Sequence, residues 1–340
     1  MHWKNKVVLV TGICGTIGRE LLRQLCVLPV KEIIGIDNNE SELFFCAEQY
    51  KGYERISFSL TDIVSYRNLV GLFEGVDIVI HAAALKHVHL CEQTPSSAIE
   101  TNINGTQNVI DAALHCGVGR VVFTSSDKAV NPTNVMGTTK LMGERLITAA
   151  NVQRENKKTI FLSTRFGNVL GSRGSVIPLF KEQIRKGGPI TLTDESMTRF
   201  IMSCADAVKL IMDSIFHAYG GEVFVTKMPT IRITDLAKVL IDKLAPEYGF
   251  ISNNIEIKKI GVKPGEKMYE ELINHEEIRR TVEIDEYFIV KPAFYDLFSD
   301  IKYDYEKIKK TGVSSPYNSS GEKPMTEEAL TDYLLLHKLI

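Results

Sequence analysis

A methionine and a lysine four residues apart are the first side chains in this sequence that suggest a chemical function. Met136 and Lys140 would lie on one face of a helix, because residues four apart are neighbours there. A tyrosine at the first position would be a proton-transfer group, since a nearby ammonium lowers the pKa of a phenol. A thioether carries no exchangeable proton. Acid–base chemistry here must come from other side chains, or the site is inactive.

Three polar residues shortly before this methionine offer that chemistry. Ser126, Asp127 and Lys128 follow an apolar stretch, Arg120–Thr124, that we expect to form a strand. A carboxyl group donates a proton, an amine accepts one, and a hydroxyl bonds a substrate oxygen. The amine needs a lowered pKa, which burial or the charge of Lys140 would supply. The alternative is a surface turn, with Asp127 and Lys128 as a solvated pair and Ser126 as a cap.

A glycine-rich loop follows the first apolar stretch, Lys6–Thr11, and leads into an amphipathic segment, Thr16–Leu28. Glycine lets the backbone approach a pyrophosphate, which then rests on the N-terminus of the helix. Glycines also end strands for structural reasons, but the position between a strand and a helix favours a cofactor. The predicted dinucleotide contacts are Gly12, Gly15, Thr16, Ile17 and Gly18.

An aspartate follows this loop by about 20 residues, at the end of the next expected strand, Glu32–Ile36. There Asp37 can accept hydrogen bonds from the adenosine ribose hydroxyls, and it would repel a 2′-phosphate. No arginine follows at once to hold such a phosphate, so NAD is predicted rather than NADP. The alternative is that Asp37 caps a helix over Glu40–Gln49.

Two further turns are candidates for cofactor contacts. Asp62 and Ile63 follow the third expected strand, where a carboxylate would reach the adenine amino group. Ala82, Ala83 and Ala84 follow the fourth, and small residues permit close approach of the backbone to a dinucleotide. Simple turn and cap chemistry would explain either turn alone.

Apolar and amphipathic segments alternate through the first half of the chain. This pattern predicts an α/β fold, a Rossmann-like doubly wound parallel sheet, with a smaller C-terminal substrate-binding domain. We expect an NAD-binding domain over residues 1–168 and a mainly substrate-binding domain over 169–340, with the chain able to cross back. Helices are expected, among others, at Ser65–Phe73, Ser96–His115, Ala205–His217, Thr234–Leu244 and Thr326–Leu339.

The composition is that of a folded protein without a polyanionic partner. Hydrophobic residues make up 44% and charged residues 24% of the 340 residues, and the formal net charge is −2. This balance gives no electrostatic case for binding nucleic acid or an anionic membrane. No apolar stretch approaches the roughly 18 residues of a membrane-spanning helix, so a cytoplasmic protein is expected. The six cysteines include no C-x-x-C pair, and no metal site is expected.

Several segments together resemble the extended short-chain dehydrogenase/reductase family. Within it they are most similar to the bacterial dehydratases that act on UDP-N-acetylglucosamine. Besides the glycine loop, the resembling segments are residues 81–88, 101–106, 126–140, 165–178, 197–200 and 263–267. Some branches of these dehydratases carry methionine at the position of Met136. The resemblance therefore implies an active enzyme rather than a reductase that has lost its tyrosine.

The resemblance also implies roles for individual residues. Asp127 would be the acid for the leaving C6 hydroxyl and Lys128 the base at C5. Ser126 would bond the C4 hydroxyl, and Lys140 would hold the nicotinamide ribose. Asn102 and Phe166 join the cofactor contacts. Polar and pocket-lining groups for the UDP-sugar are Lys86, Asn168, Arg173, Val176, Thr191, Arg199 and Glu266.

The implied reaction is a 4,6-dehydration that yields UDP-2-acetamido-2,6-dideoxy-α-D-xylo-hexos-4-ulose. Bound NAD⁺ takes a hydride from C4, the C5 proton and the C6 hydroxyl leave, and the hydride returns to C6. Asp37 and the wording of residues 131–137 favour the branch that retains the C5 configuration.

Three alternatives remain open at this stage. They are an inverting dehydratase/5-epimerase, a nucleotide-sugar 4-epimerase, and a non-catalytic NAD-binding regulator. Met136 argues against the epimerase, which needs a tyrosine to shuttle the C4 proton. The combination of Asp127, Lys128 and Lys140 argues against the regulator. A homo-oligomer is expected, of a size that the sequence does not give.

Overall fold

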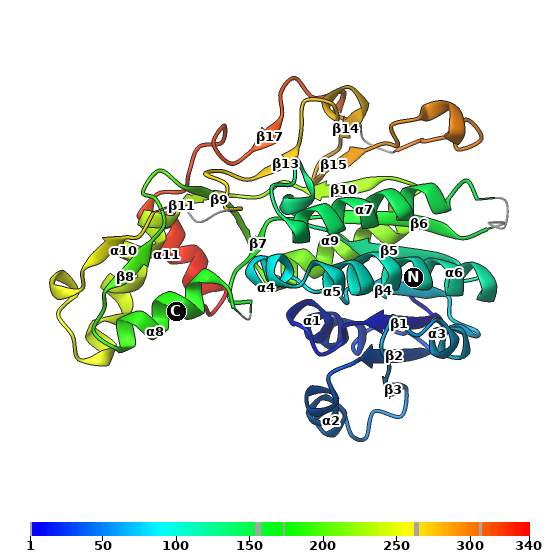
Figure 1. Ribbon diagram of the computed structural model, residues 1–340, viewed down its shortest axis with the longest axis horizontal. Helices are drawn as coiled ribbons and strands as arrows, with labels where there is room; N and C mark the ends of the chain where they lie inside the picture. Colours follow the sequence, from blue (N-terminus) through cyan, green and yellow to red (C-terminus); the bar gives the residue numbers. More distant parts are fainter. Residues whose placement is uncertain (1, 154–157, 173, 262–264, 306–307) are drawn as a thin grey trace.

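A ten-stranded sheet forms the centre of the computed structural model (Figure 1). The structure describes residues 2–153, 158–172, 174–261, 265–305 and 308–340. The strand order is β16-β14-β15-β10-β6-β5-β4-β1-β2-β3. The parallel strands are β1 (Val7–Thr11), β2 (Glu32–Asp37), β3 (Ile56–Leu60), β4 (Ile78–His81), β5 (Arg120–Thr124), β6 (Ile160–Arg165) and β10 (Val223–Thr226). Because the order β3-β2-β1-β4-β5-β6 is that of dinucleotide-binding folds, the predicted fold class is confirmed.

Apolar residues run almost without interruption along the inner strands because both faces of the sheet are covered. All five residues of β1 are buried, and they alternate between two cores. Val8 and Val10 pack with α1 and α9, whereas Val7 and Leu9 pack with α3, α6 and α7. The helices that accompany the sheet are α1 (Thr16–Leu25), α2 (Glu40–Gln49), α3 (Tyr66–Phe73), α4 (Val88–Gln93), α5 (Pro95–Ile99), α6 (Gly105–Cys116), α7 (Val135–Ala150) and α9 (Cys204–His217).

The helix expected over Ser96–His115 is interrupted in the structure. A π-helical turn, η1 (Glu100–Asn104), separates α5 from α6. π-turns of this kind are common at functional sites, because the wider turn re-aims a side chain. Here the turn holds Asn102, whose side chain is buried. Its Oδ1 accepts from Leu85 N–H, and its Nδ2 donates to the Leu85 carbonyl and to Thr139 Oγ1. The interruption therefore joins the loop after β4 to helix α7.

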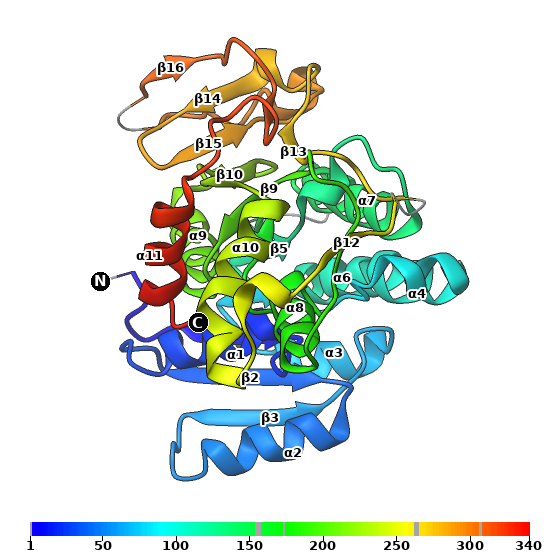
Figure 2. The same ribbon diagram turned by 90° about the vertical axis from the view of Figure 1, so that its left-hand side faces the viewer.

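Beyond residue 168 the chain contributes to two parts of the molecule. It returns to the central sheet with β10 and with three antiparallel strands, β14 (Thr281–Glu283), β15 (Tyr287–Val290) and β16 (Lys310–Thr311). Figure 2 shows these strands at the opposite end of the sheet from β3.

Short 3₁₀ turns are η2 (Asp127–Ala129), η3 (Pro246–Tyr248), η4 (Ser252–Asn254), η5 (Ile278–Arg280) and η6 (Tyr295–Phe298).

The other part is a smaller lobe with its own apolar core. It projects to one side of the sheet in Figure 1. Its helices are α8 (Val176–Arg185), α10 (Ile233–Leu244) and α11 (Glu327–Leu336). Small sheets connect the lobe to the rest: β7 (Asn168–Val169), β8 (Ile190–Leu192), β9 (Thr198–Met202), β11 (Thr230–Arg232), β12 (Ile257–Lys259), β13 (Glu271–Ile273) and β17 (Tyr317–Asn318). Within the described ranges, no helix combines the length and the apolar character needed to cross a membrane.

Candidate active site

The glycine loop after β1 has no room for larger residues at two positions. A Cβ on Gly12, where φ is 70°, would lie 2.8 Å from the Cα atom of Ala83. A Cβ on Gly18 would lie 2.2 Å from the carbonyl oxygen of Gly12. Gly15 is the N-cap of α1 and supplies no side-chain acceptor to the first turn of the helix. This loop fits the pyrophosphate of a dinucleotide.

Asp37 lies beside this loop at the carboxyl end of β2. Its Oδ2 accepts a hydrogen bond from the backbone N–H of Cys14 (3.0 Å), and its Oδ1 accepts one from Asn39 (3.0 Å). The alternative role of Asp37 as a helix cap is wrong, because Asn39 caps α2 by accepting from Glu42 N–H (3.1 Å). Each carboxylate oxygen has a second lone pair. Asp37 therefore fits the predicted contact with ribose hydroxyls.

A buried histidine, which the sequence did not single out, fixes the loop after β4. Thr106 Oγ1 donates to the Asn102 carbonyl (2.7 Å), so it accepts from His81 Nε2 (3.1 Å). Nδ1 of His81 then accepts from Thr11 Oγ1 (2.8 Å), which itself accepts from the N–H groups of Ala82 and Ala83. Burial, and secondarily the charge of Lys140, lowers the pKa of His81 to about 3. This neutral histidine thus anchors the predicted segment Ala82–Ala84.

The other predicted cofactor residues lie along the same edge of the sheet. Asp62 accepts hydrogen bonds from Asn38 Nδ2 and from the backbone of Val64. Ile63 is buried under α6 at Gly105, where an added Cβ would come within 2.7 Å of it. Phe166 is buried, and its carbonyl accepts from the backbone N–H of Asp127 (3.1 Å). As cofactor contacts, these residues and Asn102 stay predictions.

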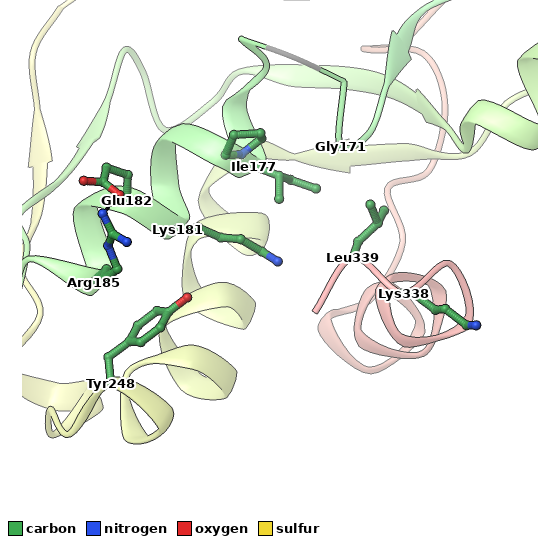
Figure 3. A pocket seen from close by; sticks show the side chains of 9 residues that line it. Gly171, Ile177, Lys181, Glu182, Arg185, Tyr248, Lys338 and Leu339 are labelled. Carbon is green, nitrogen blue, oxygen red and sulfur yellow. Dashed lines mark ion pairs between the residues drawn. The ribbon is translucent and has the colours of Figure 1, made fainter. Parts of the chain in front are cut away.

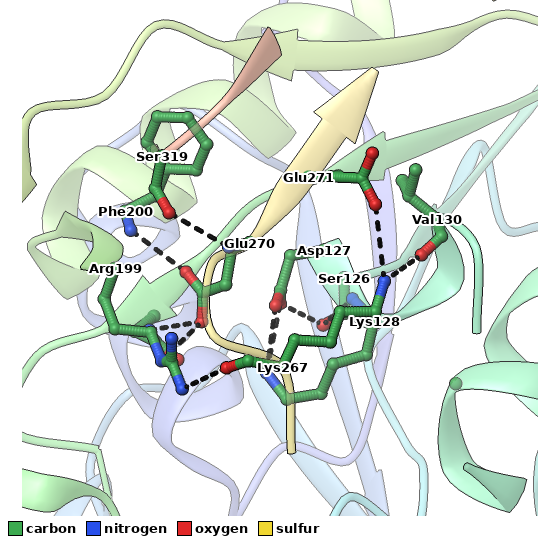
Figure 4. A network of polar contacts seen from close by, with 12 residues as sticks. Ser126, Asp127, Lys128, Val130, Arg199, Phe200, Lys267, Glu270, Glu271 and Ser319 are labelled. Atoms are coloured by element: carbon green, nitrogen blue, oxygen red, sulfur yellow. Dashed lines mark hydrogen bonds and ion pairs between the residues drawn. The ribbon is translucent and has the colours of Figure 1, made fainter. Parts of the chain in front are cut away.

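Asp127 and Lys128 form a partly buried ion pair directly after β5 (Figure 4). Lys128 Nζ lies 3.2 and 3.1 Å from the two oxygens of Asp127, and Ser126 Oγ donates to Asp127 Oδ1 (2.7 Å). The Asp127 side chain is only 4% exposed and that of Lys128 is 32% exposed. A solvated surface turn is therefore excluded, although Ser126 does cap the turn η2 by accepting from Lys128 N–H.

The expected lowering of the Lys128 pKa is wrong for the protein as it stands here. Burial alone would lower the pKa, but the charges of Asp127 and of Glu270 outweigh burial and raise it above the ordinary value. Lys140 is not among the groups that act on Lys128; the cation that opposes the rise is Arg199. The unmodified site therefore favours the ammonium form of Lys128.

Met136 and Lys140 share helix α7 as predicted, with Asn134 as its N-cap. Met136 is 4% exposed and packs with Cys91 and Ala98. Lys140 Nζ donates to the Thr124 carbonyl (2.8 Å), and burial lowers the pKa of Lys140 to about 8. Met136 therefore fills space, while Lys140 stays at the sheet edge where a nicotinamide ribose is expected.

Glu270 is a site residue that sequence reasoning missed. Its carboxylate accepts from Asn168 Nδ2 (2.7 Å) and from the backbone N–H of Phe200 (3.0 Å), and Arg199 Nε lies 3.4 Å away. Burial, and then the charge of Asp127, raises the pKa of Glu270 to about 7. It comes just before the short strand β13, and no local pattern distinguishes it from its neighbour Glu271.

The structure brings some predicted substrate residues to this ion pair and leaves others apart. Asn168 and Arg199 lie beside Glu270, and the guanidinium of Arg199 donates to carbonyl groups of Thr198 and Lys267. Val176 and Thr191 belong to the smaller lobe, where Thr191 bonds Gln183. Lys86 and Glu266 are exposed, and Arg173 lies outside the described residues. All seven stay predictions as substrate contacts.

A second buried ionic cluster supports α7 next to this site. Arg165, at the end of β6, uses its five N–H donors on Glu144 of α7, on Glu277 before η5 and on the Leu272 carbonyl, at 2.6–3.0 Å. A guanidinium has just five donors, so this one is saturated. Glu144 lies one turn beyond Lys140 in α7. The cluster therefore holds α7 against the segment that carries Glu270.

A cavity among the described residues lies away from this chemistry. It has a volume of about 410 Å³ and is set between α8, η3 and the end of the chain (Figure 3). Its lining includes Lys181, Arg185, Tyr248 and Lys338, and none of the predicted catalytic residues. The site described above therefore rests on its side-chain geometry and not on a cavity.

Comparison with known proteins places the chain in a family. The model of the family described as "Polysaccharide biosynthesis protein" matches residues 8–292. The chain belongs to this family. The predicted resemblance to the extended short-chain dehydrogenase/reductases is thereby confirmed.

The individual similarities span nearly the whole chain. An uncharacterized membrane protein of Methanocaldococcus jannaschii is 48% identical over 318 residues, covering 91% of this chain and 95% of that protein. A protein of Rickettsia massiliae named UDP-glucose 4-epimerase is 38% identical over 338 residues, covering 97% and 96%. The X-ray structure of Pen from Bacillus thuringiensis matches with a TM-score of 0.92 at 40% identity, covering 100% of both chains.

Proposed function

We propose that this protein is an NAD-dependent UDP-N-acetylglucosamine 4,6-dehydratase that retains the configuration at C5. The product is UDP-2-acetamido-2,6-dideoxy-α-D-xylo-hexos-4-ulose. One observation carries the proposal: a partly buried Asp127–Lys128 pair follows β5, beside a helix in which Met136 stands where a tyrosine would transfer protons. A carboxyl and an amine within 3.1 Å of each other suit an elimination that needs one acid and one base.

The residues that would hold NAD are the glycine loop, Asp37, the Ala82–Ala84 segment and Lys140. When bound, NAD⁺ accepts the hydride from C4 of the sugar and returns it to C6. The protein supplies the proton transfers. An edge formed by the carboxyl ends of parallel strands is where doubly wound folds bind such ligands, and β1, β4 and β5 all end there.

Two protons leave the sugar during the reaction, and two return. The C4 hydroxyl proton passes through Ser126 to the Asp127 carboxylate, which is 2.7 Å away. The uncharged Lys128 amine takes the C5 proton. Protonated Asp127 then gives its proton to the C6 oxygen, so the C6–O bond breaks and water leaves. Lys128 returns its proton to C5, and both groups are restored without a tyrosine.

The competing function is a nucleotide-sugar 4-epimerase, and the name of the Rickettsia relative favours it. A substrate that carries deuterium at C4 separates the two. Dehydration moves the label to C6 and lowers the product mass by one water, whereas epimerisation leaves the label at C4 and the mass unchanged. Mass spectrometry and NMR of the product measure both. Label retained at C4 in UDP-N-acetylgalactosamine would overturn the proposal.

A further inference from the structure

Glu270 has no part in the proton transfers described above, yet it is the most constrained carboxyl of the site. It is 4% exposed. Asn168 Nδ2, Phe200 N–H and Arg199 all bond its side chain, and Ser319 Oγ accepts from its backbone N–H (2.9 Å). Partners on three sides fix the carboxylate in one position, at a cost in conformational entropy.

In Figure 4 this carboxylate lies beside the Asp127–Lys128 pair, and its own bonds run to Phe200 and Arg199. Besides burial, the charge of Asp127 raises the pKa of Glu270 and the charge of Lys128 lowers it. In turn, Glu270 helps to raise the pKa of Lys128. Two carboxyls and one ammonium therefore share one electrostatic balance, with Arg199 as the second cation acting on it.

The remaining charged groups near this segment are already paired with one another. Lys267 Nζ donates to the Val130 carbonyl (2.7 Å) and lies 3.7 Å from Glu271. Glu271 also accepts from Asn131 Nδ2 (3.2 Å). The two adjacent glutamates thus have different surroundings: Glu270 is held by Asn168, Phe200 and Arg199, whereas Glu271 lies near Lys267 and Asn131.

We propose that Glu270 is a positioning residue for the dehydration, whose buried carboxylate holds Lys128 as an ammonium ion and so sets the pH above which the C5 proton is removed. This inference rests on the proposed function, in which Lys128 accepts that proton as an uncharged amine. An anion near an amine stabilises its charged form. A neutral group of the same shape should let Lys128 lose its proton at a lower pH.

The test compares Glu270→Gln with its matched neighbour Glu271→Gln. The glutamine can keep two of the three side-chain partners: its oxygen accepts from Phe200 N–H, and its NH2 donates to Asn168, which can turn its amide, whereas the attraction of Arg199 is lost. In the pH dependence of product formation, we expect the limb that rises with pH to shift down by about 1 pH unit in Glu270→Gln. Glu271→Gln should keep the wild-type midpoint. A lower rate in Glu270→Gln with an unmoved midpoint would overturn the inference.

A second measurement does not depend on turnover or on how well the glutamine variant folds. Lysine labelled with ¹³C at Cε reports the titration of each amine by NMR, and Lys128→Arg assigns the signal. In the wild type, the Lys128 midpoint should lie above that of exposed lysines, and Glu270→Asp, which keeps the charge, should preserve it. A wild-type midpoint at or below the exposed lysines would overturn the inference. Absence of any dehydration product, with the raised midpoint present, would instead count against the proposed function alone.

Discussion

The ends of two neighbouring strands carry two ionic clusters that differ in how completely their charged groups are paired. At the end of β6, Arg165 is saturated by Glu144, Glu277 and a carbonyl group, and its side chain is 1% exposed. After β5, the side chain of Lys128 is 32% exposed and bonds one carboxylate, and the pKa of nearby Glu270 is raised to about 7. In the first cluster, Arg165 and Arg280, which lies 3.5 Å from Glu277, balance the charges of the two glutamates. In the second, one proton more or less changes the balance, as acid–base chemistry requires.

The pKa shifts of the carboxyls show the same difference. Burial would raise the pKa of Glu277, but Arg165 outweighs burial and lowers it below its ordinary range. Glu270 is buried to a similar degree, yet the cations near it do not prevent the rise in its pKa. Burial of a charged group therefore does not reveal its role. A structural cluster differs from a reactive one in how completely its charged groups are paired.

The largest expected effect comes from breaking the saturated cluster. Arg165→Leu would leave buried Glu144 without a counter-charge and Glu277 with only Arg280, 3.5 Å away, and we expect the free energy of unfolding to fall by about 3–5 kcal/mol. Chemical denaturation monitored by circular dichroism measures this. The matched control is Lys238→Ala, which breaks a half-exposed pair with Glu327 and should cost about 0–1 kcal/mol. Equal losses in the two variants would contradict the distinction.

Breaking the reactive cluster should affect activity far more than stability. Lys128→Met removes the proposed base, and we expect kcat to fall by about 100-fold or more. The unfolding free energy should fall by less than in Arg165→Leu, because Asp127 keeps its hydrogen bond from Ser126. Product formation and denaturation are measured on the same preparation. Wild-type kcat in Lys128→Met would rule out Lys128 as the base.

The two clusters should also differ in how their stability depends on pH. The ordinary pKa of a glutamate is 4.5, and that of folded Glu270 is about 7. Between these values the folded protein holds a proton that the unfolded chain has lost, so the contribution of Glu270 falls as pH rises. Relative to Glu270→Gln, the wild type should lose on the order of 1–2 kcal/mol between about pH 5 and about pH 8. Parallel stability curves for the two proteins would contradict this.

The smallest effect is expected where the site looks most unusual. Met136→Leu conserves volume against Cys91 and Ala98, so it should cost less than about 1.5 kcal/mol of stability. The rate of dehydration should stay within about threefold of the wild type. A loss of 10-fold or more, with the fold intact, would show that the sulfur takes part in the reaction.

Local patterns predicted the loop after β1 and the strand end that carries Asp37. The spacing of Gly12 and Gly18 reflects contacts with Ala83 and with the loop itself, and Asp37 is placed by the strand that precedes it. These features depend on neighbours in sequence or on the fixed order of a doubly wound sheet. For the same reason, the expected strands Lys6–Thr11, Glu32–Ile36 and Arg120–Thr124 lie within one residue of β1, β2 and β5.

Long-range pairing explains what could not be predicted. Glu270 lies 143 positions beyond Asp127 in the chain, just before the short strand β13, which pairs with β17 near the C-terminus. At the π-turn, Asn102 bonds Leu85 and Thr139, which lie 17 and 37 positions away. Arg165 reads as the last residue of an ordinary strand until Glu144 and Glu277 are placed around it.

One measurement tests the central claim most directly. The purified protein is incubated with UDP-N-acetylglucosamine in deuterated water, and the sugar is followed by ¹H NMR. We expect a 4-keto-6-deoxy sugar with deuterium at C5, because Lys128 exchanges its proton with solvent. The ring couplings should show the original C5 configuration. UDP-N-acetylgalactosamine without deuterium at C5, or unchanged substrate, would contradict it.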